Sequence, residues 1–301
     1  VSLNGEYVYK INDPDAINGF IYNPGEAILF NGTYSKKGFG VSLGMKRVDN
    51  MSFKSDRSAT GSDLAINFLP AMAKQHTYAL LAFYPYATQA TGEISWQGDL
   101  NYKVKNETAL GGKYGMDINL NYSAAYGLDT TLLDPAQDSS RRGYTVNYFG
   151  IGDLYFQDIN VEITKKVSPK LKLIIQYANQ SYNKDVVEGA HGEGIIYSNI
   201  AMLQTIYKIS DSRSVRTELQ HLYTEQDKKS WAMALVEVGL GEHWMLSAMD
   251  LFNYGNDEAS KRKHYYNGNI TYVKGTTRIS LGYGKQRAGI FCVGGVCRYV
   301  P

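Results

Sequence analysis

The sequence contains no long apolar run, and this absence argues against a helical membrane anchor. No stretch of about 18 apolar residues occurs anywhere in the 301 residues, and the mean hydropathy is −0.33. A transmembrane helix is therefore not expected. A membrane β-barrel would not be detected in this way, because only alternate residues of its strands meet lipid, which dilutes the average hydropathy.

The chain also has little net charge. Charged residues make up 20% of it, and the formal net charge is only +2. This balance supplies no strong attraction to phosphate backbones, so we expect no nucleic-acid partner. Tryptophan is scarce and tyrosine abundant, with 3 Trp against 25 Tyr. Tyrosine suits membrane–water interfaces, but soluble β-proteins use it as freely, so composition alone leaves both classes open.

What is present is a long alternation of apolar and polar residues. In the stretch 92–104, Ile94, Trp96 and Leu100 alternate with polar residues, and the stretch 109–125 continues in the same way. Side chains on a strand point alternately to opposite faces, so each stretch predicts one long strand with an apolar and a polar face. Ordinary strands have about five or six residues, whereas a tilted crossing of a bilayer needs about 9–11.

The same period predicts fifteen strands along the chain. Two of them, 61–69 and 75–86, have apolar residues on both faces, as does 230–240. The expected strands are 3–10, 26–34, 38–54, 61–69, 75–86, 92–104, 109–125, 150–165, 169–182, 193–209, 213–226, 230–240, 243–254, 263–273 and 277–286. We therefore predict an all-β fold, an antiparallel transmembrane β-barrel of about 14–16 or more strands.

Short and long connections alternate between these strands, with the short link 227–229 as the exception. Tight turns are expected at sites such as 35–37, 166–168 and 274–276, and longer links at sites such as 126–149 and 183–192. Outer-membrane barrels have short periplasmic turns and longer external loops, whereas a soluble sandwich has no reason to keep that asymmetry. The alternation places the segment after Gln286 on the external side.

The strand count bears on the ends of the chain. An odd number of strands leaves an open edge, which lipid does not tolerate. The chain opens with VSLNGEYVYK, which has neither a basic nor an apolar leader region and no initial Met. We expect one β-barrel domain over residues 1–301 that is incomplete at the C-terminus and open to extension at the N-terminus.

Charged residues of both signs fall on the polar face of the strands. The residues expected to face the lumen are Lys46, Glu93, Asp99, Lys103, Lys113, Asp117, Glu162, Lys172, Arg216, Glu218 and Arg278. They could line a polar conduit, or they could cross-link a closed interior through ion pairs. The balance of signs argues against strong ion selectivity.

The two cysteines form the sharpest local feature. Cys292 and Cys297 flank a Gly-Gly pair, and glycine adopts the positive φ that a tight turn demands. Because the external side is not reducing, we predict a disulfide that closes a small loop. A two-thiolate metal site would lack further ligands, and a redox pair would need another scaffold.

No motif indicates catalysis, and no cofactor or metal is expected. None of the five histidines has the spacing of a metal site. One G-x-S-x-G match runs from Gly40 to Gly44, but it lies inside an alternating strand instead of on a strand-to-helix turn. We therefore predict that the protein is not an enzyme.

Five segments together carry a resemblance to a known family: Ile11–Asn18, Lys46–Phe53, Lys74–Tyr78, Tyr84–Gln89 and Gly289–Arg298. As a set they resemble a family of Bacteroidota outer-membrane β-barrels whose function is unassigned. The resemblance spans most of the chain. It implies outer-membrane location and barrel architecture, supplies no catalytic residues, and implies members longer at both ends.

Two functions remain open at this stage. The first is an integral outer-membrane barrel, acting as a porin-like conduit or as a structural or accessory member of a larger complex, with outer-membrane lipid and other outer-membrane proteins as partners. The second is a soluble secreted β-sheet protein whose apolar faces turn inward and which binds a glycan or another ligand. Strand length and the alternation of turns and loops favour the first.

Overall fold

The computed structural model describes residues 1–61, 63–293 and 296–300, and for residues 290–293 and 296–300 it describes the backbone alone. In this part of the chain, thirteen strands form one sheet and two form a separate hairpin. The strands of the sheet are β1 (Ser2–Lys10), β2 (Gly25–Lys36), β3 (Phe39–Asp49), β4 (Gly92–Val104), β5 (Met116–Leu132), β6 (Tyr144–Lys166), β7 (Leu171–Asn183), β8 (Ile195–Ser210), β9 (Arg213–Tyr223), β10 (Trp231–Leu240), β11 (Trp244–Phe252), β12 (His264–Lys274) and β13 (Thr277–Gly284). The hairpin consists of β14 (Gly289–Val293) and β15 (Val296–Val300).

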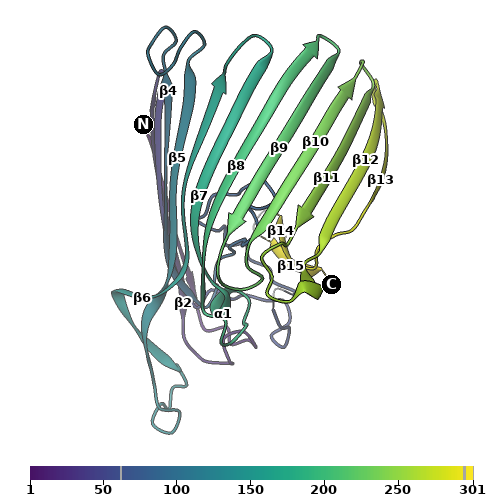
Figure 1. Cartoon of the computed structure of the whole chain (residues 1–301). Coiled ribbons are helices and arrows are strands. Elements are labelled where there is room, and N and C mark those ends of the chain that lie inside the picture. Colours follow the sequence, from purple (N-terminus) through teal and green to yellow (C-terminus); the bar gives the residue numbers. More distant parts are fainter. Residues whose placement is uncertain (62, 294–295, 301) are drawn as a thin grey trace.

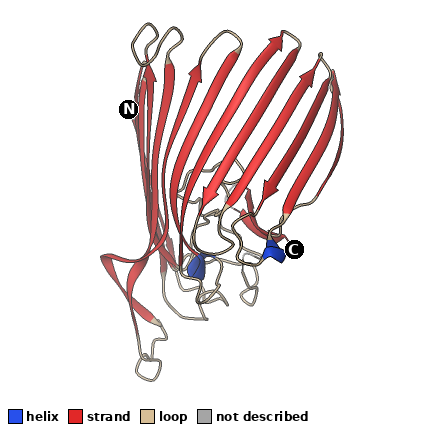
Figure 2. Cartoon of the chain, viewed as in Figure 1, coloured by secondary structure: helices blue, strands red, loops and turns tan. Residues whose placement is uncertain are grey.

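Every strand of the sheet pairs antiparallel with its neighbours in sequence, in the order β1 to β13. The sheet curls around an interior, as Figures 1 and 2 show. Within the described residues β1 and β13 do not pair with each other, so the barrel is open between them. The predicted all-β antiparallel architecture is thus confirmed, with thirteen strands in the sheet where about 14–16 or more were expected.

The alternation of the sequence separates the two faces of the sheet. On the convex face, apolar side chains of adjacent strands stand opposite one another, as in the row formed by Ile163, Ile175, Leu203 and Leu219. These side chains are open to the surroundings: Leu219 is 55% exposed and Ile175 is 47% exposed. The concave face carries polar residues such as Asn121, which is 4% exposed. The two-residue period therefore assigns the residues to the convex and concave faces as the sequence predicts.

The connections also alternate as expected, with one exception: residues 105–115 form a longer connection between β4 and β5 where a tight turn was expected at 105–108. One end of the sheet has short turns such as 37–38, 211–212 and 275–276, which lie at the top of Figure 1. The other end has the long links, among them 184–194, which contains the one-turn helix α1 (Lys184–Val187). The hairpin β14–β15 lies at this long-link end too, where the alternation predicts the segment after Gln286.

The main departure from expectation concerns residues 50–91, which we call the inner segment. The predicted strands 61–69 and 75–86 are wrong: the segment is almost entirely turn and coil, apart from an isolated bridge between Lys54 and Ala65. It follows β3 and precedes β4 in the chain, and its residues 71–86 lie inside the curl of the sheet, where they pack against β5 to β11. Apolar residues on both faces of 75–86 favour full burial over a strand with one exposed face, and most of the apolar side chains of that part are buried without forming a strand. In 61–69, by contrast, Leu64, Ile66 and Phe68 are 56%, 57% and 60% exposed.

The inner segment supplies one side of the hydrophobic core. Leu80 and Leu81 are 0% and 1% exposed. They belong to one cluster with concave-face residues of β5 to β11, including Ile200, Leu222 and Trp231. A buried leucine contributes about 1.5–3 kcal/mol. The core therefore lies between the inner segment and the concave face of the thirteen-stranded sheet, toward the long-link end. We call this sheet the wall.

Strands β5 and β6 extend beyond the rest of the sheet, where residues 126–149 were expected to be a loop. Register shifts between Ala125 and Thr130 bend the pair, which flares outward at the lower left of Figure 1. Two side-chain contacts join this extension to β3. Tyr144 donates a hydrogen bond to Asp49 at 2.7 Å, and Arg47 lies 4.3 Å from the ring centre of Tyr148.

Candidate lumenal site

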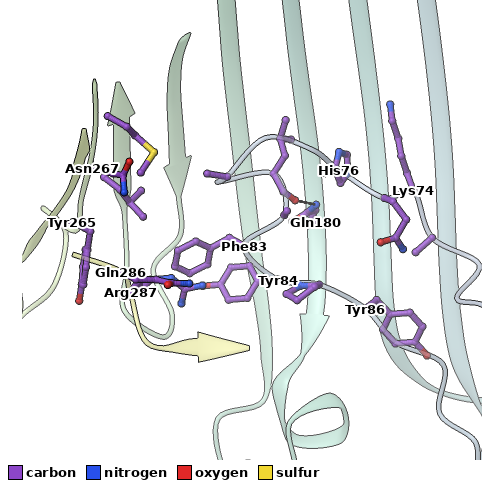
Figure 3. Close-up of a pocket in the computed structure, with 18 of the residues that line it drawn as sticks. Lys74, His76, Phe83, Tyr84, Tyr86, Gln180, Tyr265, Asn267, Gln286 and Arg287 are labelled. Carbon is purple, nitrogen blue, oxygen red and sulfur yellow. Dashed lines mark hydrogen bonds between the residues drawn. The ribbon is translucent and has the colours of Figure 1, made fainter. Parts of the chain in front are cut away.

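A cavity of about 560 Å³ lies between the inner segment and the last strands of the sheet. One side is formed by the inner segment, including Phe83, Tyr84 and Tyr86. The other is formed by β11, β12 and residues 284–287, as Figure 3 shows for Tyr265, Asn267, Gln286 and Arg287. This volume is typical of a cavity that holds a small molecule. The candidate site is therefore inside the curl of the sheet, where the inner segment leaves room.

A buried ion pair fixes one end of the inner segment to the wall. Lys46 Nζ of β3 lies 3.0 Å from Glu93 Oε1 of β4, and their side chains are 3% and 0% exposed. Glu93 also accepts hydrogen bonds from Tyr86 Oη and from the backbone N–H of Gln89, both at 2.7 Å. Lys46 also donates to the Pro70 carbonyl. Both charges are thus compensated, which a buried pair requires.

A histidine anchors the middle of the inner segment. His76 Nε2 lies 2.6 Å from Asp158 Oδ2 of β6, and Gln176 Nε2 lies 3.3 Å from His76 Nδ1. Because the amide nitrogen of Gln176 is a donor, Nδ1 of His76 is assigned as the acceptor, and Nε2 of His76 therefore carries the hydrogen atom. Asp158 also accepts from Gln180 Nε2 at 3.0 Å and from Asn160 Nδ2 at 2.7 Å. The network holds the segment beside the cavity.

Lysine ammonium groups also bind carbonyls of the non-sheet backbone. Lys10 Nζ donates to the Ser52 carbonyl at 2.8 Å. Lys54 Nζ donates to the carbonyls of Gly61 and Asp63 at 2.8 and 2.7 Å. Buried carbonyls need a donor, and irregular backbone has no ladder to supply one. Lys10 therefore joins β1 to the start of the inner segment, and Lys54 joins two parts of the segment itself.

Aromatic and cationic side chains meet at the long-link end of the cavity. The guanidinium carbon of Arg287 lies 4.0 Å from the ring centre of Phe83, and Lys285 Nζ lies 5.1 Å from that of Tyr265. Phe83 also packs against Trp231, with ring centres 5.0 Å apart. Cation–π contacts of this kind contribute about 0.5–2 kcal/mol each. They join residues 285–287 to the inner segment.

An ion pair joins two of the long links to each other, and a hydrogen bond joins them to the inner segment. Lys184 Nζ lies 2.8 Å from Asp227 Oδ1, and Tyr84 Oη donates to Asp227 Oδ2 at 3.2 Å. Burial raises the pKa of the Asp227 carboxyl, but the hydrogen bond and charge of Lys184 outweigh it, so the pKa falls below its ordinary value. Burial, followed by the charge of Asp227, raises the pKa of Tyr84. Asp227 is therefore held ionised and Tyr84 neutral.

The predicted lumen residues are placed in several environments. Glu93 is fully buried as described, and Asp99 accepts a hydrogen bond from Asn121 Nδ2 at 2.7 Å. Lys103 and Asp117 lie 3.9 Å apart and are 66% and 53% exposed, near the short-turn end. Their joint role in a lumen stays a prediction.

The remaining predicted residues lie on β9, on β13 and in a turn. Arg216 bridges Glu218 at 2.9 Å and Glu237 at 3.3 Å. Arg278 is exposed near the start of β13, at the open edge of the sheet. Lys113 lies in the turn before β5, because that strand begins only at Met116 and not at the predicted residue 109, and its Nζ is 5.8 Å from the ring centre of Tyr114. Its role in a lumen stays a prediction.

The cysteine pair can be placed only by its backbone. Cys292 and Cys297 stand opposite each other in the β14–β15 pair. Facing residues in antiparallel strands have Cα atoms about 4.5–5.5 Å apart, within the range that a disulfide spans. Their side chains lie outside the described residues, so the disulfide stays a prediction.

Several residues around the cavity were not predicted from sequence. They are Lys74, His76, Phe83, Tyr84, Gln180 and Tyr265. The only local signal was the apolar character of both faces in 75–86, which was interpreted as a strand. In the described part of the chain, no group of three or more His, Cys, Asp or Glu could hold a metal ion, and no helix has the length and apolar character to cross a membrane.

Comparison with known proteins yields one family and several structures. A family model described as a family of unknown function (DUF6029) matches residues 1–301. Two mutants of the Rh. blastica porin are 12% and 13% identical, with TM-scores of 0.35 and 0.36, each alignment covering 94% of this chain and 93% or 94% of the porin. A structure described as "Asymmetric conductivity of engineered proteins" is 13% identical over 94% of each chain, with a TM-score of 0.34. No curated protein matches the chain.

Proposed function

The chain belongs to the family of unknown function DUF6029, and we propose that it is an integral outer-membrane β-barrel that conducts small solutes along a lumen narrowed by the inner segment. A Bacteroidota outer membrane is the setting that the proposal assumes. The proposal rests on one observation: apolar side chains stand exposed across the convex face while the concave face is polar. Examples are Leu43, 61% exposed, and Leu281, 75% exposed. Water does not tolerate so broad an apolar band, whereas lipid requires it.

Membrane insertion also agrees with the backbone. Each strand from β2 to β12 has partners on both sides, so its N–H and C=O groups are satisfied without water. A bilayer imposes that condition on any spanning segment. The soluble alternative would need the apolar faces to turn inward, yet Leu120 and Ile159 point away from the inner segment and are 45% and 48% exposed.

The inner segment supports a narrow passage in preference to a wide pore. Its cluster covers concave-face residues from β5 to β11, and Met72 approaches Gly44 of β3. The cavity beside β12 and the end of β13 adjoins this segment. The ion pair of Lys46 with Glu93 and the contact of His76 with Asp158 hold the segment in place. We therefore propose a constriction that is fixed in position.

Two measurements test this function. Purified full-length chain should need detergent to stay monodisperse and should show heat-modifiable gel mobility. In planar bilayers it should give small single-channel steps, and Tyr265→Ala should enlarge them by removing a ring from the cavity wall. Tyr283→Ala, on the convex face and 78% exposed, is the matched control and should leave the steps unchanged. Folded protein that gives no steps would overturn the conduit.

An accessory barrel is the second candidate function. The extension of β5 and β6 exposes Leu132 and Phe149, which are 82% and 88% exposed. Large apolar side chains on an external projection are typical of a contact surface for another protein. Absence of conductance, together with stoichiometric co-purification of a second outer-membrane protein, would favour this candidate.

A further inference from the structure

The end of the wall that carries the short turns is strongly basic. We define the short-turn rim as residues 36–38, 103–117, 165–172, 208–213, 240–244 and 274–278, and it lies at the top of Figure 1. Its acidic residues are Glu107, Asp117, Asp211 and Glu242. Its basic residues are Lys36, Lys37, Lys103, Lys105, Lys113, Lys165, Lys166, Lys170, Lys172, Lys208, Arg213, Lys274 and Arg278. Because the whole chain has a formal net charge of only +2, the rest of the chain is net negative.

The positive charges of the short-turn rim are little compensated within the chain. Among the described side chains, Lys103 is the one basic residue of the rim that lies within ion-pair distance of an acid, 3.9 Å from Asp117. Lys36 Nζ lies 5.6 Å from the ring centre of Phe39, a contact that leaves its charge in place. All of the basic side chains of the rim are exposed except Lys165, which is half-buried. The rim therefore presents a net positive surface.

The long-link end differs, because acidic and basic residues lie there in the same links and pair with each other. Lys229 Nζ lies 2.6 Å from Asp257 Oδ1, and Lys261 Nζ lies 2.6 Å from Glu258 Oε1. The excess of unpaired positive charge therefore belongs to the short-turn rim and is not a property of the whole surface.

Part of the rim lies on the convex face, next to its apolar and aromatic residues. Two residues along a strand point to the same face and are about 7 Å apart. Three basic residues have such a neighbour on the convex face: Lys36 follows Tyr34, Arg213 precedes Val215, and Lys274 follows Tyr272. If the convex face meets hydrocarbon, these long side chains reach the level of the lipid headgroups.

Aromatic residues mark the same level of the wall. Tyr102, Tyr207 and Trp244 lie on the convex face beside the short turns, and each is roughly half exposed. Aromatic girdles of this kind lie at the membrane–water interface of barrels. The basic residues follow the girdle from β2 to β13. A lipid leaflet surrounds a barrel and can contact all of them, whereas a globular protein would contact one side.

We propose that the short-turn rim binds the headgroups of anionic phospholipids in the leaflet that surrounds the short turns. The lysine and arginine side chains donate charge-assisted hydrogen bonds to the phosphate oxygens, and the acyl chains lie along the apolar convex face. The inference names the lipid partner of the proposed outer-membrane barrel, and it rests on the insertion of that barrel into a bilayer.

The test is electron spin resonance of spin-labelled phosphatidylglycerol and phosphatidylcholine in phosphatidylcholine vesicles that contain the full chain. The share of motionally restricted label measures how strongly each lipid associates with the protein. Phosphatidylglycerol should associate about 5-fold more strongly, the factor that corresponds to about 1 kcal/mol for one basic side chain near the membrane surface. The preference should shrink in about 1 M salt, where the screening length falls to about 3 Å. Equal association of the two lipids would overturn the proposal.

Variants of exposed residues locate the binding. The rim variant, Lys36→Gln with Arg213→Gln and Lys274→Gln, should reduce the preference for phosphatidylglycerol at least about 2-fold. The matched control, Arg57→Gln with Arg141→Gln and Arg142→Gln, removes the same charge from the long-link end and should keep the full preference. Motionally restricted lipid in both samples shows that both variants are inserted. An equal preference in the two variants would assign it to net charge and overturn the role of the rim.

The lipid site and the proposed function fail separately. Restricted lipid without a preference for phosphatidylglycerol would keep the inserted barrel and remove the lipid site. A preference for phosphatidylglycerol without bilayer conductance would keep the lipid site and remove the conduit. Absence of restricted lipid from every sample would remove both, because the site requires an inserted barrel. Equal association of the two lipids, with binding of polyglutamate lost only in the rim variant, would assign the rim to an acidic protein instead.

Discussion

The wall of the barrel and the inner segment use apolar residues in opposite ways. In the wall, apolar and polar residues alternate, and the apolar ones are exposed on the convex face, as at Leu219, which is 55% exposed. In the inner segment they follow one another, and Leu80 and Leu81 are 0% and 1% exposed. The comparison shows that the period of the apolar residues, more than their number, decides which side of the sheet they occupy.

Charged residues show the same division. In the wall near the short turns, Lys103 and Asp117 lie 3.9 Å apart and are well exposed. Where the wall meets the inner segment, Lys46 and Glu93 lie 3.0 Å apart and are almost fully buried. An exposed pair contributes about 0–1 kcal/mol, whereas loss of one partner of a buried pair costs about 3–5 kcal/mol.

The largest effect is expected from breaking the buried pair. Lys46→Met leaves the Glu93 carboxylate buried without its cation and should lower the free energy of unfolding by about 3–5 kcal/mol. Lys103→Met, in the exposed pair, should change it by about 0–1 kcal/mol. Urea unfolding in lipid vesicles measures both. Equal effects would show that the inner segment is not held by this pair.

The next largest effect is expected from a substitution that leaves a cavity in the hydrophobic core. Leu80→Ala removes a fully buried side chain and should lower the free energy of unfolding by about 2–5 kcal/mol. The same unfolding assay applies, with Leu281→Ala as control, since Leu281 is 75% exposed on the edge strand β13. A Leu80→Ala protein as stable as the control would mean that the inner segment does not form a core.

A charge on the convex face tests the contact with lipid. Leu219→Arg should cost about 2–4 kcal/mol in a bilayer, because arginine on the lipid face is destabilising near the midplane. Leu132→Arg, in the extension of β5, should cost little, since that side chain lies beyond the rest of the sheet and is 82% exposed. The folded fraction in vesicles, read from heat-modifiable mobility, compares them. A Leu219→Arg protein that folds in vesicles as well as the natural protein would contradict insertion of the convex face into lipid.

The predicted disulfide should have a smaller effect. Closing so small a loop contributes about 2 kcal/mol by chain entropy, so Cys292→Ser should lower stability by at most that amount. Thiol titration of the denatured, unreduced protein should find no free thiol in the natural chain and one in the variant. Two reactive thiols in the natural chain would refute the bridge.

The smallest effect is expected from a change of pH, which acts on the ion pair of Asp227 with Lys184 in the links beside the inner segment. The folded-state pKa of Asp227 lies below its ordinary value of 3.8, so its pairing with Lys184 stabilises fully above that value and is lost as pH falls through the lowered pKa. The natural protein should melt above Asp227→Asn at pH 7, and the difference should vanish at strongly acidic pH. Asp257→Asn, which breaks the exposed pair with Lys229, should show almost no difference at either pH. A constant gap for Asp227→Asn would contradict the pairing.

The sequence predicted the wall closely. Strand positions such as 92–104 and 213–226 agree with β4 and β9 to within a few residues, and the two faces follow the period. The wrong strands 61–69 and 75–86 did not disturb the alternation of short and long connections. Removing two consecutive strands leaves the direction of all later strands unchanged, so the segment after Gln286 still falls at the long-link end.

The sequence by itself determined which residues form the wall and which side of it each one faces, because both follow from a period of two residues along a strand. Only the tertiary structure decided that residues 71–86 turn inward and that a cavity remains beside β12. The contacts responsible join residues far apart in the chain: His76 meets Asp158, 82 positions on, and the Leu80 N–H meets Gln220, 140 positions on. A local pattern carries no record of such partners, since they become neighbours only when the sheet curls around them.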